Sequence, residues 1–173
     1  MEFLLRKGMR ESPSRELVRI VREIQFDPQV RKLIDIHLIK SASDMINEWA
    51  IREYRAIASE IHSLLDDEDI KVGSEFIAKL HSKALSFQDE LGALGELKKP
   101  PPADLEWDYL IRKLNGLKVC KSLASFLRQG PLHASDVFVL KSRLHQVKLS
   151  CPEEKELIRI AEAKLVEISS NLN

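Results

Sequence analysis

The sequence has few cysteines and no long uninterrupted apolar run. Its 173 residues include two cysteines, Cys120 and Cys151, which are too few for a disulfide framework or a four-thiolate zinc site. It has no run of about 18 uncharged apolar residues, and its N-terminus lacks the apolar core and small-residue cleavage site of a signal peptide. These absences predict an intracellular protein, cytoplasmic or nuclear, with no membrane partner.

Motifs of the common catalytic and cofactor sites are also missing. No two of the five histidines have the four-residue spacing that places two metal ligands on one helix face. The six glycines form neither a phosphate-binding loop nor a dinucleotide fingerprint, and a Gly-x-Ser-x-Gly pattern is absent. The sequence therefore predicts no metal, no cofactor and no catalytic residues. An enzyme whose site is assembled from separate helices remains an alternative.

The two cysteines have different expected roles. Cys120 falls on an apolar stripe, which predicts a buried structural thiol. Cys151 stands near the start of a predicted helix, where the helix dipole can lower the pKa of a thiol. A reactive thiol at this position is an alternative to a structural one, although the sequence identifies no base beside it.

Apolar residues recur at spacings of three and four along the whole chain, which predicts an all-α multi-helix bundle of seven to eight helices. Residues 1–13 are expected to form a loose arm. Asp27 and Pro28 are a typical helix start, and no proline or glycine follows within residues 29–65. We expect one long central helix or two abutting ones, with a weak point at residues 41–44 and a possible new N-cap at Ser43. The apolar residues cover more than one stripe, so a homo-oligomer through this helix is an alternative to burial within the bundle.

A run of three prolines marks the clearest break in the chain, because it favours an extended segment and excludes helix. It predicts a linker at residues 99–103 between an N-terminal helical subdomain, residues 1–98, and a C-terminal four-helix subdomain, residues 104–173. Within the second, Asn115 and Gly116 are expected to separate two helices.

Charge is balanced overall but unevenly distributed. The chain has 27 Lys and Arg against 27 Asp and Glu, yet residues 112–148 hold eight basic residues and a single acid, Asp136. The candidate partner-binding residues are Arg112, Lys113, Lys118, Lys121, Arg128, Lys141, Arg143 and Lys148. A basic stretch of this kind attracts acidic peptides or phosphates, although solvated helix faces carry such charge without any partner.

The favoured hypothesis is a non-catalytic protein–protein interaction or scaffold module that docks an acidic segment of a partner protein on a basic face. The alternative is a helical nucleic-acid-binding protein that uses the same residues on phosphates. Base stacking needs exposed aromatic rings. The basic stretch has only Phe126 and Phe138, and both are assigned here to core stripes.

Residues 105–172 resemble the N-terminal helical bundle of transcription elongation factor S-II and its relatives. The resemblance rests on Leu-Ile-Arg-Lys-Leu-Asn-Gly-Leu at 110–117, Val-Leu-Lys-Ser-Arg-Leu at 139–144 and Ile-Ala-Glu-Ala-Lys-Leu-Val at 160–166. It implies binding of short motifs in other transcription proteins. The family's Thr-x-Ile-Gly element is missing and its Trp-Lys pair reads Glu167-Ile168, so the resemblance is not taken as membership.

Overall fold

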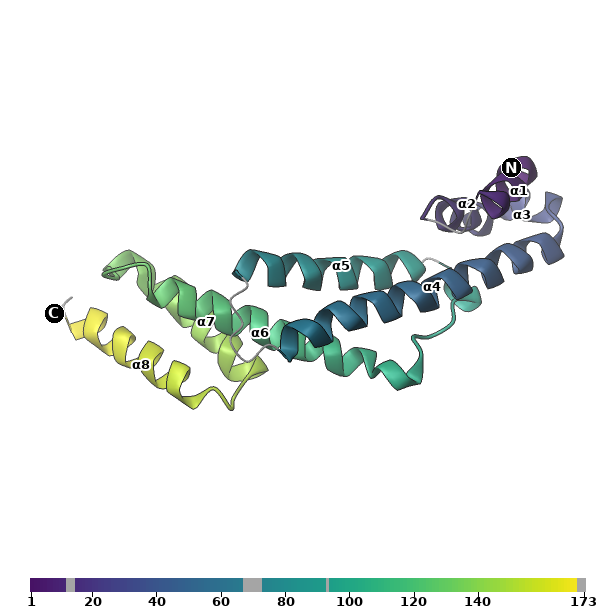
Figure 1. Ribbon diagram of the computed structural model, residues 1–173. Helices are drawn as coiled ribbons and strands as arrows, with labels where there is room; N and C mark the ends of the chain where they lie inside the picture. The colour runs from purple at the N-terminus through teal and green to yellow at the C-terminus, as the bar shows by residue number, and fades with distance from the viewer. Residues whose placement is uncertain (12–14, 67–72, 93, 171–173) are drawn as a thin grey trace. The chain divides into compact units, whose positions relative to one another are not determined.

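The computed structural model describes residues 1–11, 15–66, 73–92 and 94–170, and every regular element within these ranges is helical (Figure 1). The α-helices are α1 (Glu2–Arg10), α2 (Arg15–Phe26), α3 (Pro28–Leu33), α4 (Ile36–Leu65), α5 (Ser74–Gly92), α6 (Trp107–Leu127), α7 (Val137–Ser150) and α8 (Lys155–Ser170). Three short 3-10 helices are η1 (Gly95–Leu97), η2 (Ala103–Leu105) and η3 (Ala134–Asp136). The predicted all-α class, with seven to eight helices, is confirmed.

The chain forms two compact units, and each is built from segments that are distant in sequence. The first unit comprises residues 1–63 and 82–107, and the second comprises residues 64–81 and 108–173. The expected division into an N-terminal subdomain, residues 1–98, a linker, residues 99–103, and a C-terminal subdomain, residues 104–173, stays a prediction.

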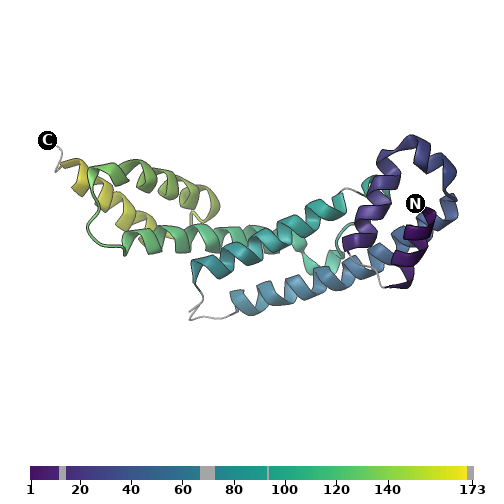
Figure 2. The same cartoon turned by 90° about the horizontal axis from the view of Figure 1, so that it is seen from above.

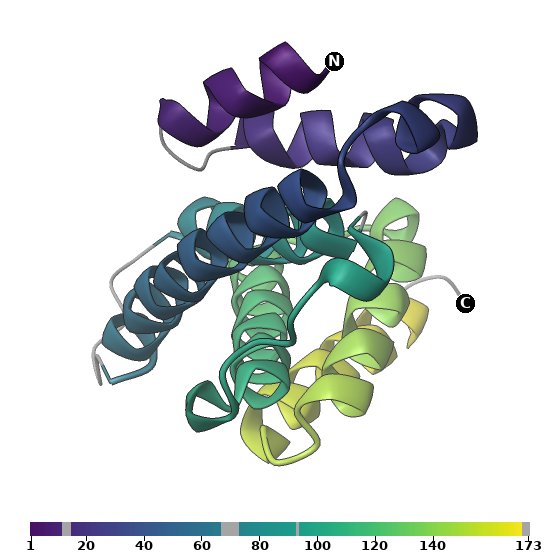
Figure 3. The same cartoon turned by 90° about the vertical axis from the view of Figure 1, so that its right-hand side faces the viewer.

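The expectation of a loose N-terminal arm is wrong for the residues that form α1. This helix lies beside α2 in the first unit (Figure 3). Leu5 is fully buried, and a Cβ atom added to Gly8 would lie 3.1 Å from Leu17 Cδ1. A nine-residue helix is too short to be stable alone in water, so packing against α2 stabilises it.

The start of α3 has the cap that the sequence predicts. A carboxylate oxygen of Asp27 accepts hydrogen bonds from the backbone N–H groups of Gln29 at 2.9 Å and Val30 at 3.2 Å. Pro28 occupies the first helical position, where its missing N–H costs nothing.

The long apolar stretch forms two abutting helices, as one of the two alternatives predicted, but the break lies earlier than expected. Ile34 has extended backbone angles, and Asp35 then accepts a hydrogen bond from the N–H of His37 at 2.9 Å. Ser43 is not an N-cap. It is buried inside α4, and its hydroxyl donates to the carbonyl oxygen of Ile39 at 2.8 Å.

An aromatic cluster fills the core between α4 and the second half of α5, which run side by side in the first unit (Figure 2). The ring of Tyr54 meets Phe87 edge to face at a centroid distance of 4.9 Å and Trp107 at 4.7 Å. Trp49 meets the same Phe87 at 5.5 Å, and Trp107 Nε1 donates to Gln88 Oε1 at 3.2 Å. Edge-to-face geometry of this kind adds to the free energy gained by burial.

The hydroxyl of Tyr54 is the exception in this cluster, because it is buried without a hydrogen-bond partner among the described residues. Burial raises the pKa of Tyr54 from 10.0 to about 12. The folded protein therefore holds this proton in a pH range in which the unfolded chain releases it, and stability is lost as the pH rises from about 10 to about 12.

We expect the free energy of unfolding of the wild type to fall more steeply between pH 10 and pH 12 than that of Tyr54→Phe, which has no proton to lose. Urea unfolding at stepped pH values measures both slopes. Parallel curves for the two proteins would contradict a role for Tyr54 in the alkaline transition.

The core of the second unit lies where α6 packs with α7 and α8, of which the last two lie side by side (Figure 1). Its buried members are Val119, Leu123, Phe126, Leu140, Leu144, Val147, Cys151, Ala161 and Ile168. The expected burial of Phe126 is thus confirmed.

Helix α6 runs without interruption through Asn115 and Gly116, so the expected break between two helices is wrong. A Cβ atom added to Gly116 would lie 2.6 Å from Cys151 Sγ and 3.7 Å from the carbonyl oxygen of Ser150. The glycine permits close approach of the chain that follows α7 and does not end the helix.

Candidate functional site

The structure distributes the predicted basic residues over several faces of the second unit. Arg112 and Lys113 are exposed near the start of α6, and Lys113 Nζ lies 5.7 Å from the ring centroid of Tyr109. Lys118 and Lys121, three residues apart, share another face of the same helix and are half-buried. Arg128 is exposed just after α6 ends.

The three basic residues of α7 divide between its two sides. Arg143 Nη1 donates to the carbonyl oxygen of Ser122 at 2.8 Å, and its guanidinium carbon lies 4.6 Å from the ring centroid of Phe126. Arg143 therefore joins α7 to α6. Lys141 and Lys148 are exposed on the other side of α7.

Two large apolar side chains share that exposed side. Phe138 is 81% exposed and Leu149 is 71% exposed, so the assignment of Phe138 to the core is wrong. The helix carries apolar residues on both sides: Leu140, Leu144 and Val147 are buried in the core, and Val137 packs against it. We call Phe138, Lys141, His145, Lys148 and Leu149 the α7 outer face.

The apolar and the basic residues of the α7 outer face are each separated by whole helical turns. Phe138 and Leu149 are three helical turns apart, about 16 Å along the axis, and Lys141 and Lys148 are two turns apart. Lys148 Nζ lies 2.6 Å from Glu162 Oε1 of α8, and both side chains are about half exposed. An exposed ion pair of this kind contributes little to stability, so Lys148 can exchange Glu162 for another carboxylate at small cost.

A second feature of this unit, missed from the sequence, involves Lys118. Its Nζ lies 3.4 Å from Nδ1 of His81, which is buried. Burial, and then the charge of Lys118, lower the pKa of His81. Nδ1 of the imidazole accepts a hydrogen bond from the ammonium group of Lys118. Lys118 also lines a cavity of about 310 Å³ together with Ser74 and Gln146.

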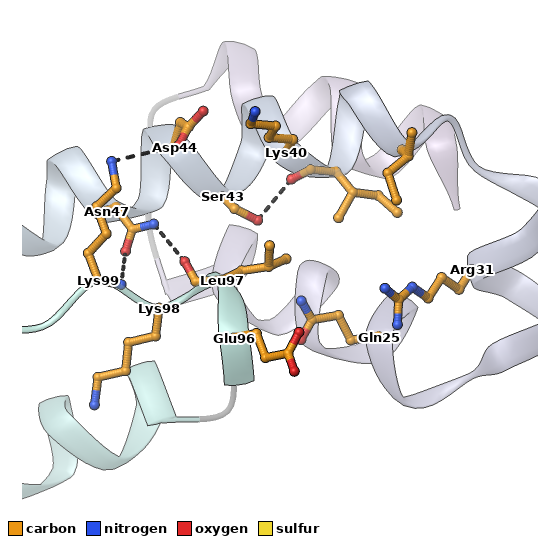
Figure 4. A pocket seen from close by; sticks show the side chains of 12 residues that line it. Gln25, Arg31, Lys40, Ser43, Asp44, Asn47, Glu96, Leu97, Lys98 and Lys99 are labelled. Carbon is orange, nitrogen blue, oxygen red and sulfur yellow. Dashed lines mark hydrogen bonds and ion pairs between the residues drawn. The ribbon is translucent and has the colours of Figure 1, made fainter.

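The first unit contains a separate cavity of about 300 Å³ between α2, α3, the start of α4 and residues 96–99 (Figure 4). Asn47 fixes its wall, because its Nδ2 donates to the carbonyl oxygen of Leu97 at 2.8 Å and its Oδ1 accepts from the N–H of Lys99 at 2.9 Å. The cationic side chains of Arg31, Lys40 and Lys98 point away from one another in this view. They do not converge on one ligand atom.

This cavity could not be located from the sequence, because the segments that line it are about fifty residues apart. The one signal was Asn47, an amide within the apolar stripe of a long helix. An amide in that position needs a partner when it is buried.

The described residues offer no group of three His, Cys, Asp or Glu side chains that could hold a metal ion. Among the helices described, none combines the length and the apolar character needed to cross a lipid bilayer.

No family model, curated protein or solved structure matches this chain. The resemblance of residues 105–172 to the bundle of elongation factor S-II gains no support from these comparisons and is carried no further.

Proposed function

We propose that this protein is a non-catalytic helical interaction module that binds an acidic, partly apolar segment of a partner protein on the α7 outer face. The observation that carries the proposal is the exposure of Phe138 and Leu149 beside Lys141 and Lys148, on the side of α7 opposite its core residues. Exposed apolar side chains grouped among charged ones are typical of interaction sites.

The chemistry of the face defines its partner. Two apolar side chains about three turns apart match an amphipathic helix that presents its own apolar residues at the same spacing. The two ammonium groups match carboxylates on the flank of that helix, which set its orientation and speed its association. The partner segment is therefore acidic on one flank and apolar along one stripe.

A protein partner fits this face better than nucleic acid does. Arg143, one of the predicted phosphate-binding residues, is turned towards α6 and bonded to a backbone carbonyl. The face then offers two lysines, whereas nucleic-acid binding depends on neutralising many phosphates. Leu149 also gives an aliphatic surface that cannot stack on a base.

The test uses fluorescence anisotropy with two probes at low salt. One probe is a labelled helical peptide with leucines eleven residues apart and glutamates on one flank, and the other is a labelled oligothymidylate. We expect the peptide to bind and the oligonucleotide to bind weakly or not at all. Phe138→Ala and Leu149→Ala are each expected to weaken peptide binding about tenfold, as residues central to interfaces do.

The charged residues are tested by Lys141→Glu with Lys148→Glu, which should abolish peptide binding and leave the circular dichroism spectrum unchanged. Lys79→Glu, an exposed charge reversal on α5 in the same unit, is the matched control and should bind as the wild type does. Oligonucleotide binding without peptide binding would replace the proposal with the nucleic-acid alternative. A dimer in sedimentation that Leu149→Ala dissociates would identify the partner as a second copy of the chain.

A further inference from the structure

The two cysteines lie together in the second unit, although they come from different elements. Cys151 Sγ lies against α6 at Gly116, and Cys120 is one turn further along the same side of that helix. After burial, the nearby Cys151 side chain is the next largest cause that raises the pKa of Cys120, which places the two side chains near each other. Both belong to the same cluster of packed apolar side chains. The arrangement is a thiol pair and not two isolated buried cysteines.

A cavity of about 230 Å³ lies beside Cys151. Cys151, Gly116 and Ser150 line it together with Arg112 and Lys113, two of the basic residues that the sequence singled out. Cys151 is therefore the thiol that a small molecule in the cavity meets first. Glu153 lines the cavity too, so the lining holds two cations and one carboxylate, and this balance favours an anionic molecule over a neutral one.

We infer that Cys120 and Cys151 form a reversible intramolecular disulfide by thiol–disulfide exchange with an anionic glutathione-type disulfide that enters through this cavity. Cys151, as thiolate, attacks one sulfur of glutathione disulfide, forms a mixed disulfide and releases one glutathione thiolate. Cys120 loses its proton to solvent and attacks the Cys151 sulfur, which forms the internal disulfide and releases the second glutathione. Two protein thiols are oxidised, and one glutathione disulfide is reduced to two thiols.

The groups around the two cysteines determine the rate of this exchange. Burial raises the pKa of Cys120 to about 12 and also raises the pKa of Cys151. The carboxylates of Glu153 and Glu154 act in the same direction, while Lys113 lowers the pKa of Cys151. Because the thiolate is the attacking species, the exchange is slow at neutral pH and accelerates as the pH rises.

The product would join α6 covalently to the residue that follows α7. This inference does not rest on the proposed binding function, since the α7 outer face includes neither cysteine. Failure of one therefore leaves the other standing.

The test exposes the reduced full-length protein to glutathione disulfide at pH 8 and follows its intact mass. We expect the wild type to lose two hydrogen atoms and to end without an attached glutathionyl group. Cys120→Ser should stop at one glutathionyl group on Cys151, because the second attack is missing. Cys151→Ser should end with at most one glutathionyl group, on Cys120, and form it slowly, because this thiol is half-buried and burial raises its pKa to about 12. Circular dichroism shows that each variant is folded.

A second comparison tests the route of entry. Arg112→Gln with Lys113→Gln should slow the reaction with glutathione disulfide several-fold more than the reaction with neutral bis(2-hydroxyethyl) disulfide. Two results would overturn the inference. In the first, glutathione disulfide modifies Cys120→Ser, but the folded wild type keeps both of its thiols available for alkylation. In the second, the wild type ends with glutathione on both cysteines. If the double substitution slows the reactions with both disulfides equally, the preference for an anionic disulfide is wrong.

Discussion

Replacing Tyr54 with alanine is expected to lower the free energy of unfolding by about 3–5 kcal/mol, as the loss of a large buried aromatic ring does. The side chain is 1% exposed and lies between the rings of Phe87 and Trp107. These rings are held by different helices, so they cannot both collapse into the space that the substitution leaves. Urea unfolding followed by tryptophan fluorescence measures the effect, because the chain's two tryptophans, Trp49 and Trp107, both belong to the first unit.

Tyr54→Phe separates the contribution of the ring from that of the hydroxyl. It keeps both edge-to-face contacts and removes a buried oxygen that has no partner among the described residues. We expect its stability at neutral pH to equal or exceed that of the wild type by up to about 1 kcal/mol, because an unpaired buried polar group is costly. If Tyr54→Phe is instead less stable than the wild type by more than about 1 kcal/mol, the hydroxyl makes a hydrogen bond in solution.

The second large expected effect is a difference in stability between alanine substitutions at two leucines of α7. Leu140→Ala is expected to cost about 2–5 kcal/mol, because Leu140 is fully buried among α6, α7 and α8. Leu149→Ala is expected to change stability by less than about 0.5 kcal/mol, because its side chain is exposed. The helix and the chemical change are the same, so the difference between the two measures burial alone.

Thermal and urea unfolding followed by circular dichroism are suitable for this pair, since the second unit contains no tryptophan. If Leu149→Ala costs as much as Leu140→Ala, its side chain is covered in solution. The α7 outer face would then be an occupied surface and not a free one.

Hydrophobic periodicity was sufficient to predict the all-α class, because it depends only on which residues can share a helix face. It did not predict α1, whose stability comes from contact with Leu17 of α2 and not from its own propensity. It also misplaced a break at Gly116, since a glycine that ends a helix and a glycine that admits a neighbouring sulfur atom look the same in sequence. Such errors arise wherever tertiary contact decides the local structure.

The candidate site shows the same limit. The excess of basic residues between 112 and 148 is a property of the sequence, but their directions are set by packing, which turns Arg143 towards the carbonyl oxygen of Ser122. The exposure of Phe138 could not be foreseen either, because α7 has apolar residues on both sides and the sequence does not say which side is covered. The proximity of Cys120 to Cys151 depends on how the turn after α7 returns to α6.

The bond between Asn47 and the backbone of Lys99 has a consequence for hydrogen–deuterium exchange. Residues 100–102 are prolines and carry no amide hydrogen. The N–H of Lys99, bonded to Asn47 Oδ1, is therefore the last exchangeable backbone hydrogen before Ala103. Release of this stretch of chain from α4 is invisible at the three positions that follow, and its rate can be read from the isotope uptake of one amide.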